Sequence, residues 1–117
     1  MSKTIGNIGE TAAIEYLLNH NFNILSKNYF SRYGEIDIIA QKDQYIIFVE
    51  VKTRKFCSMV KSYESITKNK KNKIIKTAVV YLTENKTNLQ PRFDFVEIIT
   101  NKFTNEVEFI DYFEDAF

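Results

Sequence analysis

Two adjacent apolar segments that carry ionisable residues constrain the fold more than any other feature. The stretch GEIDIIAQKDQYIIFVEVKTR, residues 34–54, is rich in β-branched and aromatic residues and is divided by the polar QKDQ. This pattern predicts two strands, Tyr29–Ala40 and Tyr45–Thr53, joined by a turn at residues 41–44. We therefore expect a hairpin that forms the centre of a sheet.

Four ionisable residues lie inside these strands, although charged side chains are rarely found in buried strands. Successive side chains of a strand point to opposite faces. Glu35 and Asp37 therefore share one face of the first strand, and Glu50 and Lys52 share one face of the second. If the strands pair across the turn, Asp37 lies about level with Glu50. We expect two carboxylates and an ammonium to meet at one end of the hairpin.

Two interpretations of these charges remain open. Neighbouring carboxylates repel each other, and burial raises the cost. The arrangement is favourable if a divalent cation lies between Asp37 and Glu50, because Mg²⁺ uses one or two carboxylates and completes its shell with water and phosphate oxygens. Lys52 could then orient a nucleophile or stabilise developing charge. The alternative is an exposed hairpin with surface salt bridges, which the apolar neighbours disfavour.

The remaining segments predict a single α/β domain over residues 1–117. Apolar residues recur at helical spacing in Ile5–Asn19 and again in Ser65–Thr83. Phe93–Ile99 and Val107–Tyr112 alternate as a second hairpin would. The expected order is α-β-β-α-β-β, with helices packed on a mixed sheet.

Glu10 on the first helix is a further candidate for the acidic set. It lies three, four and seven positions before Ala13, Ile14 and Leu17, whose stripe can face the sheet. Glu10 could thus point inward. It could equally be an exposed glutamate that the positive end of the helix dipole stabilises.

Charge is balanced overall but unevenly distributed. The net charge is +1, from 16 basic and 15 acidic residues, yet lysines crowd the second helix at Lys68, Lys70, Lys71, Lys73 and Lys76. Such a cluster can face a polyanion, or it can be an ordinary solvated helix face.

Cysteine usage and hydropathy indicate the compartment. The single cysteine, Cys57, excludes an intrachain disulfide, and no apolar run approaches the length of a membrane span. We expect a soluble cytoplasmic protein with no membrane partner.

The central motif resembles a known nuclease pattern. GEID followed by FVEVKTR, with E-x-K after Asp37, resembles the PD-(D/E)XK nuclease superfamily. More narrowly, the chain is similar to the YraN-like family of small bacterial proteins, distantly related to archaeal Holliday junction resolvases. Ile36 replaces the proline of the superfamily name, which this family tolerates. The resemblance implies a restriction-endonuclease-like fold, a mixed central sheet flanked by helices. Weaker matches extend it along most of the chain, at Gly9-Glu10, Thr67 with Lys70, Tyr81-Leu82, Arg92-Phe93-Asp94 and Ala116-Phe117.

The resemblance also implies roles for residues. Asp37 and Glu50 would bind Mg²⁺ or Mn²⁺, with the carbonyl of Val51 as a third ligand. Lys52 would be the catalytic lysine, and Glu10 would correspond to the helix-borne acid of the resolvase branch. The implied activity is metal-dependent endonucleolytic hydrolysis of DNA, with branched or junction DNA as one candidate substrate.

A DNA substrate gives the basic residues a role, because phosphate contacts dominate affinity. The expected contacts are Lys70, Lys71, Lys73 and Arg54. Two other functions stay open: a nucleic-acid-binding module with this fold and little catalysis of its own, and a protein-interaction scaffold. Symmetric cutting of a four-way junction needs two active sites, so both a monomer and a homodimer are compatible with the sequence.

Overall fold

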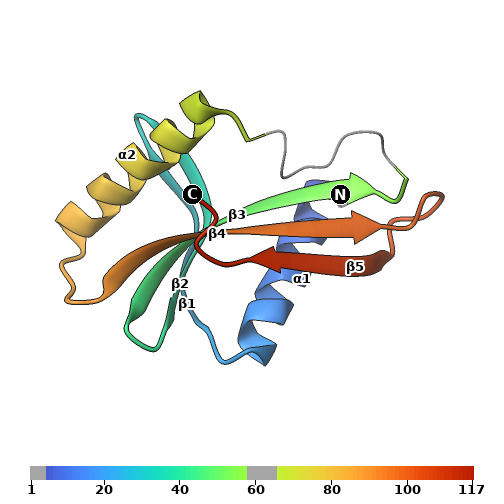
Figure 1. Cartoon of the computed structure of the whole chain (residues 1–117), viewed down its shortest axis with the longest axis horizontal. Helices are drawn as coiled ribbons and strands as arrows, with labels where there is room; N and C mark the ends of the chain where they lie inside the picture. The colour runs from blue at the N-terminus through green and yellow to red at the C-terminus, as the bar shows by residue number, and fades with distance from the viewer. Residues whose placement is uncertain (1–4, 58–65) are drawn as a thin grey trace.

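The described part of the chain forms a five-stranded mixed sheet with one helix on each face (Figure 1). The computed structural model describes residues 5–57 and 66–117, with side chains from residue 7 onward. The elements are α1 (Ile5–Asn19), β1 (Asn23–Ser31), β2 (Gly34–Lys42), β3 (Tyr45–Lys55), α2 (Lys68–Glu84), β4 (Gln90–Thr100) and β5 (Val107–Phe113). Within these residues, neither helix is long and apolar enough to cross a bilayer.

The strands lie in chain order, β1-β2-β3-β4-β5. Three neighbouring pairs are antiparallel, and only β3 and β4 run parallel. A parallel pair needs a crossover connection, and α2 lies on that connection. The expected mixed α/β architecture is therefore confirmed, as are the first helix, the central hairpin and the pairing of the last two strands.

The expected element order was wrong by one strand. The segment predicted as one strand, Tyr29–Ala40, is a hairpin of β1 and β2 that turns at Arg32 and Tyr33, and Gly34 after the turn has φ +153°. Over the described residues the order is α-β-β-β-α-β-β. The asparagines of β1 have low strand propensity, so its sequence alone does not favour a strand. As an edge strand, β1 pairs with β2 alone, so its pairing depends on that neighbour more than on its own propensity.

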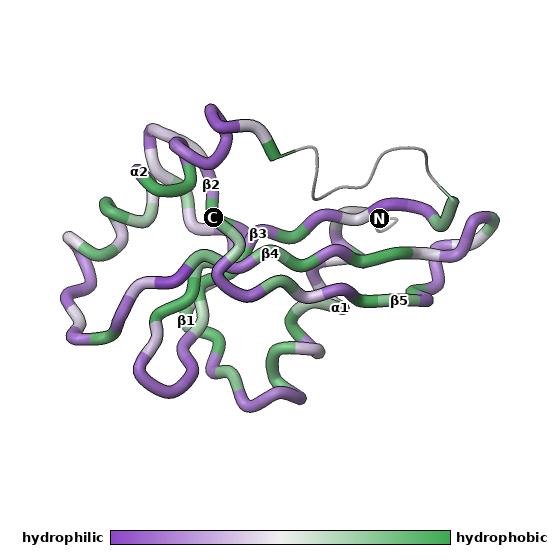
Figure 2. The backbone as a smooth tube through the Cα atoms, in the orientation of Figure 1, coloured by the Kyte–Doolittle hydropathy of each residue, from purple (hydrophilic) through white to green (hydrophobic). Residues whose placement is uncertain are grey.

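Two hydrophobic cores lie on opposite sides of the sheet. Leu17 of α1 packs with Ile38 and Val49, whereas Ile74 of α2 packs with Phe48 and other residues of the second core. Strands β2 and β3 are thus buried on both faces, which explains their nearly continuous apolar runs. Figure 2 shows these hydrophobic stretches in the central strands, with hydrophilic residues at the turns.

Strands β2 and β3 separate where the charged residues lie. Their ladder extends from Lys42–Tyr45 to Ile38–Val49 and ends there. Beyond this point β2 pairs with β1, while β3 continues beside β4 as far as Lys55–Thr100. Ile36 and Ile38 are two residues apart, so in a regular strand they would share one face. Here, Ile36 packs in the core beneath α2, whereas Ile38 packs in the core beneath α1. The sheet therefore forks just after Ile38 and Val49, next to Asp37 and Glu50.

The start of α2 is anchored by its N-cap. Thr67 is extended, at φ −77° and ψ 161°, and its hydroxyl accepts a hydrogen bond from the backbone N–H of Lys70 at 3.1 Å. This bond satisfies one of the free N–H groups of the first turn. The helix was expected to begin at Ser65, which lies outside the described residues.

Candidate functional site

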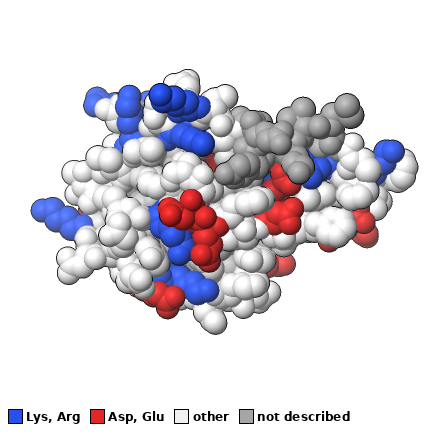
Figure 3. Space-filling view, in the orientation of Figure 1, with Lys and Arg blue, Asp and Glu red and all other residues white. Residues whose placement is uncertain are grey.

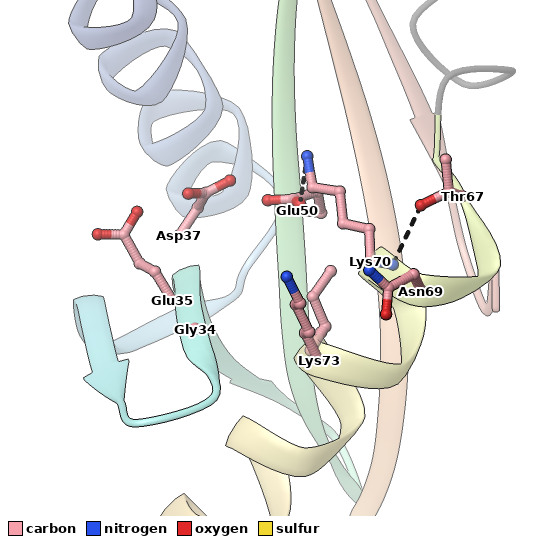
Figure 4. A pocket seen from close by; sticks show the side chains of 9 residues that line it. Gly34, Glu35, Asp37, Glu50, Thr67, Asn69, Lys70 and Lys73 are labelled. Carbon is pink, nitrogen blue, oxygen red and sulfur yellow. Dashed lines mark hydrogen bonds and ion pairs between the residues drawn. The ribbon is translucent and has the colours of Figure 1, made fainter.

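An open cavity of about 510 Å³ lies at the fork between β2 and β3. Figure 4 shows the carboxylates of β2 and β3 on one side and the first turns of α2 on the other. The cavity thus has an acidic wall and a basic wall. Its lining residues are Gly34, Glu35, Asp37, Glu50, Thr67, Asn69, Lys70, Lys73 and Ile74.

Asp37 is fixed by the backbone of the neighbouring strand. Its Oδ2 accepts a hydrogen bond from the Val51 N–H at 2.8 Å. Val51 follows the last residues of the β2–β3 ladder, so the carboxylate takes the place of a strand carbonyl at the fork. This bond orients Asp37 and satisfies a backbone donor where the strands part.

Asp37 and Glu50 form a coupled, poorly solvated carboxyl pair. Burial, followed by the hydrogen bond and the charge of Glu50, raises the pKa of Asp37 to about 8, although the Val51 N–H and the Lys70 charge oppose the shift. Glu50 itself is only 7% exposed. Without a bound divalent cation, the raised pKa favours the protonated form of Asp37 at neutral pH. Such shifts within a cavity are typical of functional sites.

Lys70 is the cation nearest to this pair among the described residues. Its Nζ lies 3.2 Å from Oε2 of Glu50, and its side chain is 43% exposed. The Thr67 cap holds the turn from which Lys70 projects (Figure 4). Lys73, one turn later, lines the same wall. The expected helix patch thus contributes two lysines to the cavity.

The other predicted basic residues lie elsewhere. Lys52 shares the α2-facing side of β3 with Glu50, but it is exposed and does not line the cavity. Nε of Arg54 is 3.2 Å from Oε1 of Glu97, and the Lys71 ammonium lies 5.9 Å from the Phe117 ring centre. Figure 3 shows Lys and Arg side chains gathered over the α2 side of the molecule.

Glu10 lies beside the acidic end without joining the pair. Its Oε1 accepts a hydrogen bond from the Asn28 side chain at 3.1 Å. Burial chiefly, then the charges of Asp37 and Glu10, raises the pKa of Glu35. Glu10 is therefore close enough to influence Glu35, but not placed among the lining residues.

The donor set at the fork fits one kind of metal. Within residues 5–57 and 66–117, no three His, Cys, Asp or Glu side chains converge closely enough to hold an ion by themselves. Asp37 and Glu50 supply two hard oxygen donors and open onto the cavity. Mg²⁺ and similar ions are bound through one or two carboxylates plus water and substrate oxygens. The pair fits such an ion, whereas it does not fit a cage of protein ligands.

Sequence reasoning missed Thr67 and Asn69 as cavity residues. A threonine three residues before Lys70, ahead of the apolar stripe of the helix, is a recognisable N-cap signal. That signal locates the start of α2, but it does not indicate which strands the helix start faces.

Comparison with known proteins identifies relatives over most of the chain. The model of "Uncharacterised protein family UPF0102" matches residues 9–98. A UPF0102 protein of Caldanaerobacter subterraneus subsp. tengcongensis is 39% identical over 116 residues, covering 98% of this chain and 95% of the relative. One of Clostridium botulinum is 43% identical over 102 residues, covering 86% and 83%. One of Dichelobacter nodosus is 41% identical over 111 residues, covering 93% and 87%.

The family match spans both carboxylates of the fork and the first turns of α2. It agrees with the YraN-like resemblance expected from GEID and FVEVKTR. The extent of the match and the identity of these relatives lead to one conclusion: the chain belongs to the UPF0102 family.

Proposed function

We propose that this protein is a Mg²⁺- or Mn²⁺-dependent endonuclease that hydrolyses DNA, with branched DNA as a candidate substrate. One observation carries the proposal. The coupled carboxyls of Asp37 and Glu50 face the lysines of α2 across an open cavity. A phosphodiester needs both features, a cation held on one side and positive charge on the other. The GEID and E-x-K pattern adds support for a restriction-endonuclease-like fold.

The metal would be held by Asp37 and Glu50, with the Val51 carbonyl proposed as a third ligand. When bound, it would polarise the phosphodiester and lower the pKa of a bound water. The protein's own part is to orient these oxygens. The hydrogen bond from the Val51 N–H to Asp37 does this at the fork.

The basic wall would position the substrate phosphate. Lys70, Lys73 and Asn69 line it at the N-terminal end of α2, where the helix dipole adds positive potential. Lys52 follows Glu50 by two residues, which is about 6.6 Å along a strand. Its flexible stem would carry the ammonium toward the water or toward a non-bridging oxygen, where it would stabilise developing charge.

A second candidate function is binding of nucleic acid with little catalysis. Two observations favour it. Lys52 does not line the cavity, and although Glu35 lines it beside Asp37 and Glu50, no three acidic side chains of the described residues converge closely enough to hold an ion. In this case the fork would still bind a cation, and the basic wall would still contact phosphates.

Cleavage assays distinguish the two candidates. Labelled four-way junction, flap, single-stranded and linear DNA would be incubated with Mn²⁺ and analysed on denaturing gels. We expect the protein to cut at least one of them. Lys52→Ala should reduce the cleavage rate by about 10²-fold or more, because it removes a group that acts in the transition state. Asp37→Asn should reduce it at least as much.

The matched control is Lys86→Ala, an exposed lysine beyond the C-terminal end of α2, which should cut at the normal rate. Binding without cleavage under all conditions would favour the second candidate. A protein that neither binds nor cuts any of these substrates would contradict both.

A further inference from the structure

We propose that Lys70 is an exchangeable cation of this site. Its ammonium occupies the carboxyl pair until a divalent cation binds there, and it then moves to the substrate phosphate. This inference rests on the proposed function. It assigns two successive partners to Lys70, first the carboxyl pair and then the substrate phosphate. It starts from the 3.2 Å contact between Nζ of Lys70 and Oε2 of Glu50.

The exposure of the two partners differs sharply. Glu50 is nearly buried, at 7%, whereas the Lys70 side chain is 43% exposed. The carboxylate is largely shielded from water, so a nearby positive charge stabilises its ionised form. The ammonium can leave its partner for solvent at little cost, because lysine is a flexible, strongly hydrated point charge. The mobile member of the pair is therefore the lysine.

Two other ion pairs show what a permanent pair looks like in this protein. In Arg54–Glu97 the side chains are 18% and 4% exposed, and in Arg92–Asp94 they are 12% and 0% exposed. Arg92 donates to both oxygens of Asp94, at 2.9 and 2.8 Å. Of the three, only Lys70–Glu50 pairs a partly exposed cation with a carboxylate that opens onto the cavity.

A divalent cation and the Lys70 ammonium would compete for the same place. A cation bound by Asp37 and Glu50 would lie within a few Å of Nζ, where like charges repel strongly at low dielectric. Binding of the ion therefore favours release of Lys70. The released side chain would remain on the basic wall beside Asn69 and Lys73, where a substrate phosphate that enters the cavity would come within its reach.

Calorimetric titration with Mn²⁺ in the absence of DNA tests the competition. In Lys70→Met, which keeps the length of the side chain without its charge, Mn²⁺ should bind about tenfold more tightly than in the unmodified protein. Lys70→Arg retains a cation and should keep the original affinity. Lys73→Met is the matched control. It removes a lysine of the same wall that has no carboxylate ion-pair partner among the described residues, so it should change the affinity much less.

DNA binding tests the second position of the ammonium. With Ca²⁺ as a non-catalytic ion, Lys70→Met should lower the slope of log affinity against log salt by about 0.9, the value of one phosphate contact. Without a divalent ion, the slope should be unchanged, because Lys70 then contacts Glu50. Melting curves of each variant establish that it is folded.

The outcomes separate this inference from the proposed function. If the unmodified protein binds Mn²⁺ and Lys70→Met binds it equally or more weakly, Lys70 is a fixed supporting residue and the inference fails alone. If neither protein binds Mn²⁺, the metal-dependent function fails as well. Tighter binding in Lys70→Met together with the metal-dependent salt slope supports the exchange.

Discussion

The Asp37 carboxyl group has two roles that other residues of the fork do not combine. It accepts a hydrogen bond from the Val51 N–H, and it is coupled to Glu50. The first interaction favours the charged form, whereas burial and Glu50 favour the neutral form. Burial dominates, since the pKa rises to about 8. The residue therefore contributes to the fold without a metal, and under the proposed function it would also bind one.

The raised pKa predicts a pH-dependent stability. The folded protein retains a proton on Asp37 that the unfolded chain releases above its ordinary pKa of 3.8. This contribution is fully present below about pH 4 and is lost as the pH rises toward 8. The free energy of unfolding should therefore fall across this window, by at most about 1.4 kcal/mol per pH unit from this group.

Urea denaturation from pH 4 to pH 8 measures this slope. Asp37→Asn is the control, because its amide oxygen can still accept the Val51 hydrogen bond while it cannot titrate. The difference between the two pH profiles isolates Asp37 from the other carboxyl groups. Parallel profiles would show that Asp37 titrates normally.

At the scale of elements, α1 is seated against β3 through a glycine. A Cβ added to Gly9 would lie 1.8 Å from Oγ1 and 3.1 Å from Cβ of Thr53. Only glycine allows the helix to approach this closely. The contact places Glu10, the next residue, at the acidic end of the fork, where it influences Glu35.

Gly9→Ala should destabilise the protein by about 1–3 kcal/mol, since the helix must move or Thr53 must change its rotamer. Chemical denaturation gives the value. In a Thr53→Ala background the Oγ1 atom is absent, so the same substitution should cost clearly less. An equal cost in both backgrounds would contradict the steric explanation.

The start of α2 has a comparable positioning role. Its Thr67 cap fixes the turn that carries Lys70, and the Ser31 hydroxyl hydrogen-bonds to Thr77 at 2.9 Å. The helix is thereby tied both to its own cap and to the β1–β2 hairpin. Two hydrogen bonds therefore help to hold the basic wall of the cavity in place.

At the scale of the whole molecule, the fork joins parts of the chain that are distant in sequence. The cavity is lined by residues at the start of β2, by Glu50 of β3 and by residues at the start of α2. Repulsion between the carboxylates at this junction opposes folding unless a proton or a cation is present. The stability of the entire fold should therefore report on ion binding.

Millimolar Mn²⁺ should raise the melting temperature, and the increase should be larger at pH 8 than at pH 6. The ion stabilises the folded state by mass action, and protons compete with it for Asp37 and Glu50 at the lower pH. Thermal denaturation followed by circular dichroism provides the measurement. Asp37→Asn should show a much smaller increase. A melting curve that does not respond to Mn²⁺ would exclude a metal at the fork.

The sequence by itself determined the local features of this protein. Strand alternation and the position of the turn predicted that Asp37 and Glu50 meet at one end of the hairpin. In the structure, Glu50 is close enough to Asp37 to raise its pKa. Helical spacing located α1, and the polar residues at 41–44 located the central turn. These features follow from periodicity and turn chemistry, which depend on neighbouring residues alone.

Only the tertiary structure decided which side chains of different elements meet. It revealed β1 as an edge strand, paired Glu50 with Lys70 rather than Lys52, and joined Arg54 to Glu97. Periodicity states which face of a strand a residue occupies, but not what packs against that face. Here, two features determined the partner of Glu50: the point where the β2–β3 ladder ends, and the position of the start of α2 across the fork. Both depend on how the entire sheet packs.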